Sequence, residues 1–256
     1  MISLAGPRQM PGAFAQLALN EARLAWRSPR GLVIGIGFPV GMLVLFGELP
    51  RYKQHVASLG GLTRFDAEVP VLATLVVAAL ALLSLPAPLA TYREQGILRR
   101  MAVTPVRPGL LLAAQVAVNA ALTVIGLVIL FSAGVAGFGV AAPKDPGALV
   151  LSLTLCTSAL LALGLFIGAV APTVGSVVVF EAASFFPLIF FAGLWIPIPE
   201  MPGALQGVAN YTALGAAVQA TQDSMQGTFP PARPLLVMAA WAAAFTLAAW
   251  RFFRWE

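Results

Sequence analysis

The sequence predicts an all-α integral membrane protein. Hydrophobic residues make up 59% of the 256 residues and charged residues only 10%, whereas soluble domains carry about 25% charged residues. The apolar residues come in runs long enough for membrane helices, which need about 20 residues each. The arginines cluster between these runs, as the positive-inside rule describes for membrane proteins. The net charge of +5 is therefore attributed to membrane orientation, and we expect lipid around the chain and no nucleic-acid partner.

Residues 12–27 predict an amphipathic helix ahead of the first membrane span. Apolar side chains such as Phe14, Leu17 and Leu24 recur at helical spacing, with charged residues such as Glu21 between them. A basic amphipathic helix of this kind is expected to lie in the plane of the membrane interface.

Six spans are expected after this helix. The stretch between Pro146 and Pro199 contains one charge, Glu181, and its length of about 54 residues is too great for one span. We divide it at a predicted turn over 172–175. Pro39 is tolerable within the first span if neighbouring groups satisfy the freed carbonyl. The predicted spans are 31–47, 69–92, a segment within 108–143, 147–171, 176–196 and 234–250.

An even number of spans puts both termini on the same side of the membrane. Cytoplasmic loops carry an excess of arginine and lysine. The side of the termini receives ten of these residues, namely Arg8, Arg23, Arg27, Arg30, Arg93, Arg99, Arg100, Arg107, Arg251 and Arg254. The other side receives five, namely Arg51, Lys53, Arg64, Lys144 and Arg233. We therefore expect both termini in the cytoplasm.

The whole chain, 1–256, is expected to form one membrane domain. It divides into a cytoplasmic or interfacial N-terminal part (1–30), a six-span bundle (31–250) and a short cytoplasmic tail (251–256). The segment 198–231 is expected to hold short, half-buried helices before the last span.

Charged residues return abruptly after the second span, in the loop 92–106. A short amphipathic helix is predicted there, and its apolar stripe consists of Ile97, Leu98, Met101 and Ala102. Arg99 and Arg100 lie beside the stripe, and Thr104-Pro105 ends the helix because a residue before proline disfavours helical geometry. Two interpretations stay open on these residues alone. The loop is either an ordinary arginine-rich cytoplasmic loop or a docking surface for a cytoplasmic partner.

This loop resembles the cytoplasmic segment of ABC-2 type transporter permeases, the group that contains daunorubicin-resistance-like exporters. Those permeases show an acidic–basic cluster, then glycine, two apolar residues and a Thr-Pro pair. The matching residues here are Glu94, Gly96, Ile97, Leu98, Thr104 and Pro105. Residues 190–202 are similar to the family's end of the fifth span, and the order of parts is similar along nearly the whole chain. Many members carry a second acid where this chain has Tyr92.

The resemblance implies a fold and a function. It implies a cytoplasmic coupling helix, an outer re-entrant segment at 198–231, and a location in the bacterial cell membrane. The protein would move a hydrophobic or amphipathic substrate, such as a drug, a lipid or a glycolipid, out of the cytoplasm or inner leaflet. Two permease chains, identical or related, would pair. The substrate cannot be named from the sequence.

The resemblance also implies an ABC ATPase subunit as partner, with ATP and Mg on that subunit and no cofactor on this chain. The residues that would couple to it are Arg93, Glu94, Gly96, Ile97, Leu98, Arg99, Arg100, Thr104 and Pro105. The residues themselves agree that the motor is a separate chain. A phosphate-binding loop needs Gly-x-x-x-x-Gly-Lys-Ser/Thr, and neither Lys53 nor Lys144 follows a glycine. We therefore expect a transport subunit without catalytic residues.

Glu181 is the only ionisable side chain deep in a predicted span. A charge in lipid costs a few kcal/mol, so such a residue faces a cavity or a partner. It either lines the transport pathway, where it binds a cationic group, or fixes helix packing as a protonated or paired carboxyl. The aromatic side chains of the same segment are a candidate wall for apolar cargo or simply bulk that faces lipid. These candidates are Phe185, Phe186, Phe190 and Trp195.

Two other protein classes are weighed against the exporter. An ion-coupled secondary transporter would use Glu181 as its coupling residue, and this is the alternative function. An intramembrane enzyme would need paired acids, a His/Asp set or a metal cluster at one depth, and no such set is found. His55 is the lone histidine and has no metal-ligand pattern around it, so we expect no metal site.

Two Gly-x-x-x-Gly pairs lie in predicted spans, Gly37 with Gly41 and Gly164 with Gly168. Such pairs allow helices to approach closely. Packing within one chain is the preferred interpretation, and a seam between two chains is the alternative.

Overall fold

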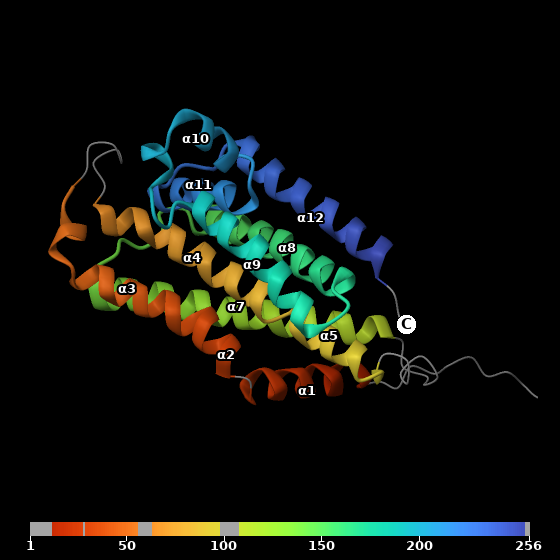
Figure 1. The fold of residues 1–256 in the computed structure, drawn as a ribbon. Coiled ribbons are helices and arrows are strands. Elements are labelled where there is room, and N and C mark those ends of the chain that lie inside the picture. The colour runs from red at the N-terminus through yellow and green to blue at the C-terminus, as the bar shows by residue number, and fades with distance from the viewer. Residues whose placement is uncertain (1–11, 28, 56–62, 98–107, 254–256) are drawn as a thin grey trace, which may run out of the picture.

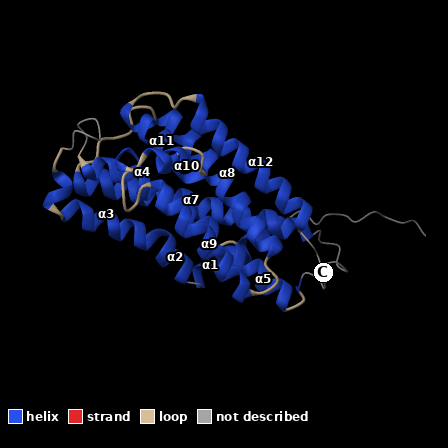
Figure 2. Cartoon of the chain, turned by 45° about the horizontal axis from the view of Figure 1, so that its top comes forward, coloured by secondary structure: helices blue, strands red, loops and turns tan. Residues whose placement is uncertain are grey.

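The computed structural model describes residues 12–27, 29–55, 63–97 and 108–253, which form one bundle of helices (Figures 1 and 2). Within these ranges, five helical segments are long and apolar enough to cross a membrane. They are Arg64–Glu94, Gly109–Phe138, Pro146–Val170, Val174–Ala192 and Ala232–Phe252. The prediction of an all-α integral membrane protein is confirmed.

Helix α1 (Ala13–Arg27) corresponds to the predicted amphipathic helix and packs against α7 (Pro108–Phe138). In Figure 1 it lies at one end of the bundle, opposite α10 and α11. Leu19 and Trp26 expose 56% and 78% of their surface. Apolar side chains exposed on a helix at the end of a membrane bundle fit the headgroup region of a bilayer.

The first predicted span is a shorter apolar helical segment than the other five. Helix α2 (Pro29–Leu32), the π-helical turn η1 (Val33–Gly37) and α3 (Phe38–Glu48) follow one another without a break. At 1.5 Å per residue the segment is about 30 Å long, which matches the hydrocarbon core. The Phe38 N–H donates to the Val33 carbonyl in the wide turn, directly before Pro39, which has no N–H to donate.

The second predicted span is bent and begins earlier than expected. It consists of α4 (Arg64–Leu83) and α5 (Pro86–Glu94), because the two prolines of α5 donate no N–H to the preceding turn. Thr63 and Asp66 form a capping box that starts α4 five residues before the predicted start at 69. Glu68 therefore lies inside this helix and is 8% exposed. The predicted start at 69 had left this acid in the preceding loop.

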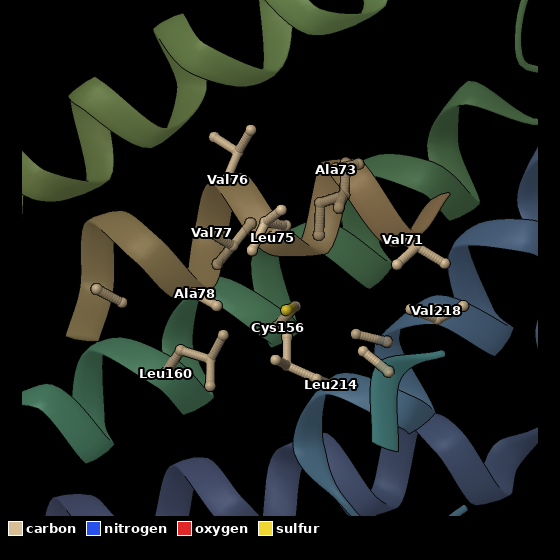
Figure 3. Packing of buried hydrophobic residues seen from close by; sticks show 14 of the residues in the cluster. Val71, Ala73, Leu75, Val76, Val77, Ala78, Cys156, Leu160, Leu214 and Val218 are labelled. Carbon is tan, nitrogen blue, oxygen red and sulfur yellow. The ribbon is translucent and has the colours of Figure 1, made fainter. Parts of the chain in front are cut away.

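Helix α4 is the centre of the bundle and is buried over most of its length. Val76 faces α7, where a Cβ on Gly126 would lie 2.8 Å from its Cγ1 atom. Figure 3 shows Ala78 near Cys156 of α8 (Pro146–Val170) and Leu214 of α11 (Ala213–Gln226). The helix thus separates α7 on one side from α8 and α11 on another.

The last three spans are α8, α9 (Val174–Ala192) and α12 (Ala232–Phe252). The predicted turn between α8 and α9 is present, and Thr173 caps α9 through its bond with the Ser176 N–H. Gly193 ends α9 with a φ of +95°, a left-handed conformation that glycine adopts at low cost.

The segment before the last span contains the predicted short helices. The 3₁₀ turn η4 (Ile198–Glu200) and α10 (Gly203–Ala209) lie at the end of the bundle away from α1 (Figure 1). Helix α11 is largely buried and packs against α4, α8, α9 and α12. A further 3₁₀ turn, η2 (Pro50–Lys53), follows α3 at the same end.

The glycine pairs differ in their surroundings. A Cβ on Gly164 would overlap the carbonyl oxygen of Ala81, and one on Gly168 would lie 2.6 Å from the Leu89 side chain. Packing within the chain is therefore confirmed for this pair. A Cβ on Gly37 or Gly41 would meet no described atom within 4 Å.

Candidate functional site

The charged end of α5 contacts α1 and α7 through one carboxylate. The Tyr92 hydroxyl donates to Glu21 Oε1 at 2.7 Å, and the Gln115 amide nitrogen donates to Glu21 Oε2 at 3.3 Å. Glu21 is 8% exposed although it belongs to a helix at the end of the bundle. It therefore joins α1, α5 and α7 by two hydrogen bonds to neutral donors.

The next residue, Arg93, contacts the end of α8. Its guanidinium donates to the carbonyl oxygens of Ala171 at 2.5 Å and Ala169 at 3.4 Å. The last carbonyls of a helix have no partner within the helix, and a cation is favourable there. The guanidinium also lies 5.9 Å from the ring centre of Phe253. Arg93 thus holds the C-terminal end of α8 and the residue that follows α12.

Glu94 contacts the beginning of α9. Its Oε1 atom accepts from the Val174 N–H at 2.9 Å, and a carboxylate at a helix N-terminus is favourable. Gly96 then turns the chain with a φ of +64°. Ile97 is helical and half-buried. Three consecutive residues, Tyr92 to Glu94, therefore fasten α5 to α1, to the end of α8 and to the start of α9.

The other predicted coupling residues lie outside the described part of the chain. These are Leu98, Arg99, Arg100, Thr104 and Pro105. The assignment of all nine residues to an ATPase contact stays a prediction.

A cavity of about 380 Å³ lies beside the end of α5. Its walls come from α1, α2, α4, α5, α7 and α9, and from the Ser84-Leu85 break. We call it the α1-side cavity. Its residues with oxygen-bearing polar side chains are Glu21, Ser84, Thr91, Tyr92, Gln115, Asn119 and Glu181.

Glu181 lines this cavity and is 7% exposed. It lies one helical turn after Val177, on the face of α9 that also buries Leu188 and Ala192. Its side chain thus borders a cavity, and a role in helix packing stays open beside a role in the pathway. Its part in transport stays a prediction.

The predicted aromatic wall does not share a site with Glu181 within this chain. None of its four aromatic residues lines the α1-side cavity. Phe185 packs against the core, whereas Phe186 and Trp195 are 59% and 58% exposed. The Phe190 ring is tilted against the Trp195 ring, with ring centres 6.4 Å apart. Phe186 and Trp195 are therefore available to lipid or to a second chain.

Sequence reasoning missed two polar residues of the cavity, Gln115 and Asn119. They are 2% and 7% exposed, and Asn119 donates to the Gln115 carbonyl oxygen. With Thr123 they form a polar row at spacing i, i+4, i+8 in an otherwise apolar span. Side chains at this spacing share one helix face, so the row was a detectable sign of a buried polar surface.

A second missed carboxylate lies at the other end of the bundle. Glu68 lines a cavity of about 280 Å³ together with Arg64, Gln206 and Gln219. Arg64 also pairs with Glu200 at 3.5 Å. This end of α4 is therefore tied to the segment after α9.

A comparison with protein families identifies this architecture. The sequence profile of the family described as ABC-2 type transporter matches residues 12–225. The match begins at α1 and ends in α11, so it includes the end of α5 and all walls of the α1-side cavity. The chain belongs to the ABC-2 type transporter family. No curated protein matches the chain significantly.

The ABC-2 membrane domain is that of a permease subunit of an ABC exporter. ABC-2 membrane domains are transport subunits, and the family generally works with an ABC ATPase partner. The narrower likeness to daunorubicin-resistance exporters is not resolved by this match.

Proposed function

We propose that this ABC-2 permease exports hydrophobic or amphipathic molecules, such as drugs, lipids or glycolipids, from the cytoplasm or inner leaflet of a bacterial cell membrane. A separate ABC ATPase, which carries ATP and Mg, docks on the segment 92–106. The observation that supports this proposal is the set of hydrogen bonds from Tyr92, Arg93 and Glu94 to α1, to the end of α8 and to α9. Both termini and this segment then face the cytoplasm.

These bonds supply a physical route from the ATPase to the membrane. A force on the segment that follows Glu94 acts on α9 through the Val174 bond and on α1 through the Tyr92–Glu21 bond. Helices α1, α5 and α9 are also walls of the α1-side cavity. A displacement of a few ångströms at this end would change the shape of the cavity, because packed helices move as rigid units.

A second permease chain completes the exporter in this proposal. Helix α9 and the residues that follow it expose large apolar side chains, among them Val179, Phe186 and Trp195. Bulky aromatic side chains on one face of a span suit a contact between two copies or a wall of the pathway between them.

The test is coupled transport by the permease reconstituted with its ATPase in proteoliposomes. We expect Glu94→Gln to weaken the contact with α9, so that transport of fluorescent amphipathic dyes falls severalfold more than ATP hydrolysis. Glu48→Gln changes an exposed acid at the other end of the bundle and serves as the matched control. ATP-independent export driven by an ion gradient would overturn the proposal and favour an ion-coupled carrier that uses Glu181.

A further inference from the structure

A buried carboxylate lines a cavity at the end of the bundle away from α1. The cavity has a volume of about 280 Å³ and lies between the start of α4, the end of α9, α10 and α11. We call it the α10-side cavity. Glu68 lines it and is 8% exposed. Its Oε2 atom accepts no hydrogen bond from any residue that the structure describes. Buried carboxylates are usually paired, or placed where a ligand pairs with them.

Two amide side chains in the same wall do not supply the missing donor. Gln206 donates to two backbone carbonyls of the segment that follows α9. Gln219 donates to the Asn210 side chain. Both amides line the cavity but are engaged elsewhere. A buried acceptor without a donor is unfavourable, so the cavity favours an occupant that brings N–H or O–H groups to Glu68.

One turn before Glu68, Arg64 adds a positive charge to the same cavity. Its Nη2 atom lies 3.5 Å from Glu200 Oε1, and within the described ranges it forms no ion pair with Glu68. A guanidinium has five N–H donors, so most of them stay available, and their planar arrangement suits a phosphate. The cavity thus presents a carboxylate and a guanidinium on residues about 6 Å apart along the helix axis.

The level of the cavity in the bilayer favours a lipid headgroup. Helix α4 begins at Arg64 and α9 ends at Ala192, and both residues line the cavity. Membrane helices begin and end where the hydrocarbon core meets the headgroups. Val71, Ile198 and Val218 add apolar walls beside the charged groups. An occupant with charges at one end and an apolar remainder therefore matches this mixture of walls.

We propose that the α10-side cavity binds a zwitterion in which a short linker joins a primary ammonium to a phosphate, as in a phosphoethanolamine headgroup. The ammonium would donate to Glu68, and the phosphate would accept from Arg64. A simple cation fits less well because Arg64 repels it, and a simple anion fits less well because Glu68 repels it. The inference goes beyond the proposed function, since this site lies at the opposite end from the segment 92–106 and needs no ATPase.

The test is native mass spectrometry of the purified permease chain released from nanodiscs, without the ATPase. The nanodiscs contain equal parts of phosphatidylethanolamine, phosphatidylcholine and phosphatidylglycerol with identical acyl chains. Phosphatidylcholine has a cation without N–H donors, and phosphatidylglycerol has no cation. We expect phosphatidylethanolamine to be retained about tenfold over both, because a hydrogen bond to a charged group is worth at least this factor. Equal retention of the three lipids would exclude a lipid headgroup as the occupant.

Variants separate this site from general binding of lipid. Glu68→Gln keeps the size of the side chain and removes its charge, so it should abolish the preference for phosphatidylethanolamine over phosphatidylcholine. Arg64→Gln should weaken retention of all three lipids, because all three contain the phosphate. Glu48→Gln changes an exposed acid at the same end of the bundle and should change neither result.

A preference that persists in Glu68→Gln would contradict the site. If that variant does not fold, the comparison of lipids on the unchanged chain and the Arg64→Gln result still decide. Unchanged retention of all three lipids in Arg64→Gln would then overturn the proposal.

A second arm distinguishes a membrane lipid from a free zwitterion. The probe is soluble glycerophosphoethanolamine, titrated calorimetrically into the chain in phosphatidylcholine nanodiscs. If the three lipids are retained equally, binding of this probe that Glu68→Gln removes would assign the site to a free zwitterion, and no binding would overturn the proposal. Neither arm involves the ATPase, so failure here overturns this inference alone. An absence of ATP-dependent export would overturn the proposed function alone.

Discussion

At the scale of single residues, hydrogen bonds between helix ends connect the α1 end of the bundle. Arg93 is the clearest case, because it reaches the Ala169 and Ala171 carbonyls from another helix. We predict that Arg93→Met lowers the free energy of unfolding by roughly 1–3 kcal/mol, since charged hydrogen bonds are worth this much and the carbonyls lose a partner. Arg93→Lys should recover only part of the lost stability. A lysine ammonium keeps the positive charge but lacks the planar guanidinium that donates to two carbonyls at once.

The measurement is denaturant unfolding in detergent, with Lys53→Met as the control at an exposed position near the other end. An equal free energy of unfolding for Arg93→Met and the unchanged chain would mean that this contact does not stabilise the fold.

The site residues show how far a single sequence leads. Glu181, Arg93 and Glu94 could be singled out from the sequence, because an acid in an apolar run and an abrupt return of charge are local signals. The α1-side cavity could not, since Glu21, Tyr92, Gln115 and Glu181 come from four helices. Only the packing of α1 against α7 and of α5 against α9 brings them together. Their distances along the chain contain no information about that packing.

At the scale of elements, the close approach of α8 to α4 depends on glycine. We predict that Gly164→Val destabilises the bundle by about 1–3 kcal/mol, the usual cost of overpacking, because any Cβ there overlaps the Ala81 carbonyl. Gly41→Val is the matched control, since its Cβ has free space. Thermal unfolding followed by circular dichroism would measure both. A smaller effect at Gly164 than at Gly41 would argue against the packing described.

Element boundaries follow from chemistry that hydropathy does not detect. The apolar runs predicted the spans, because only helices satisfy the backbone in lipid. The start of α4 was missed because the Thr63–Asp66 capping box begins the helix among charged residues. The bend before α5 follows from the prolines near its start, which were expected near the end of one continuous span. Burial of α11 was missed because its sequence mixes polar and small residues, and only tertiary contacts decide its location.

At the scale of the whole molecule, the orientation in the membrane is the main prediction from charge. Cys156 is fully buried, so it should give no background in cysteine labelling. We predict that Lys53→Cys reacts with a membrane-impermeant maleimide in intact cells and that Arg251→Cys reacts only after lysis. Both positions are exposed. The opposite pattern would invert the topology and move the end of α5 to the outer side.

The central claim is that an ABC ATPase binds this permease at the residues that follow α5. Site-specific photo-crosslinking in native membranes tests it most directly. A photoreactive amino acid at Gln95, which is exposed beside Glu94, should give an adduct that contains an ABC ATPase. The same amino acid at Tyr211, exposed at the other end, should give none. The absence of an ATPase adduct at Gln95 in a functional protein, or its appearance at Tyr211 instead, would contradict the account.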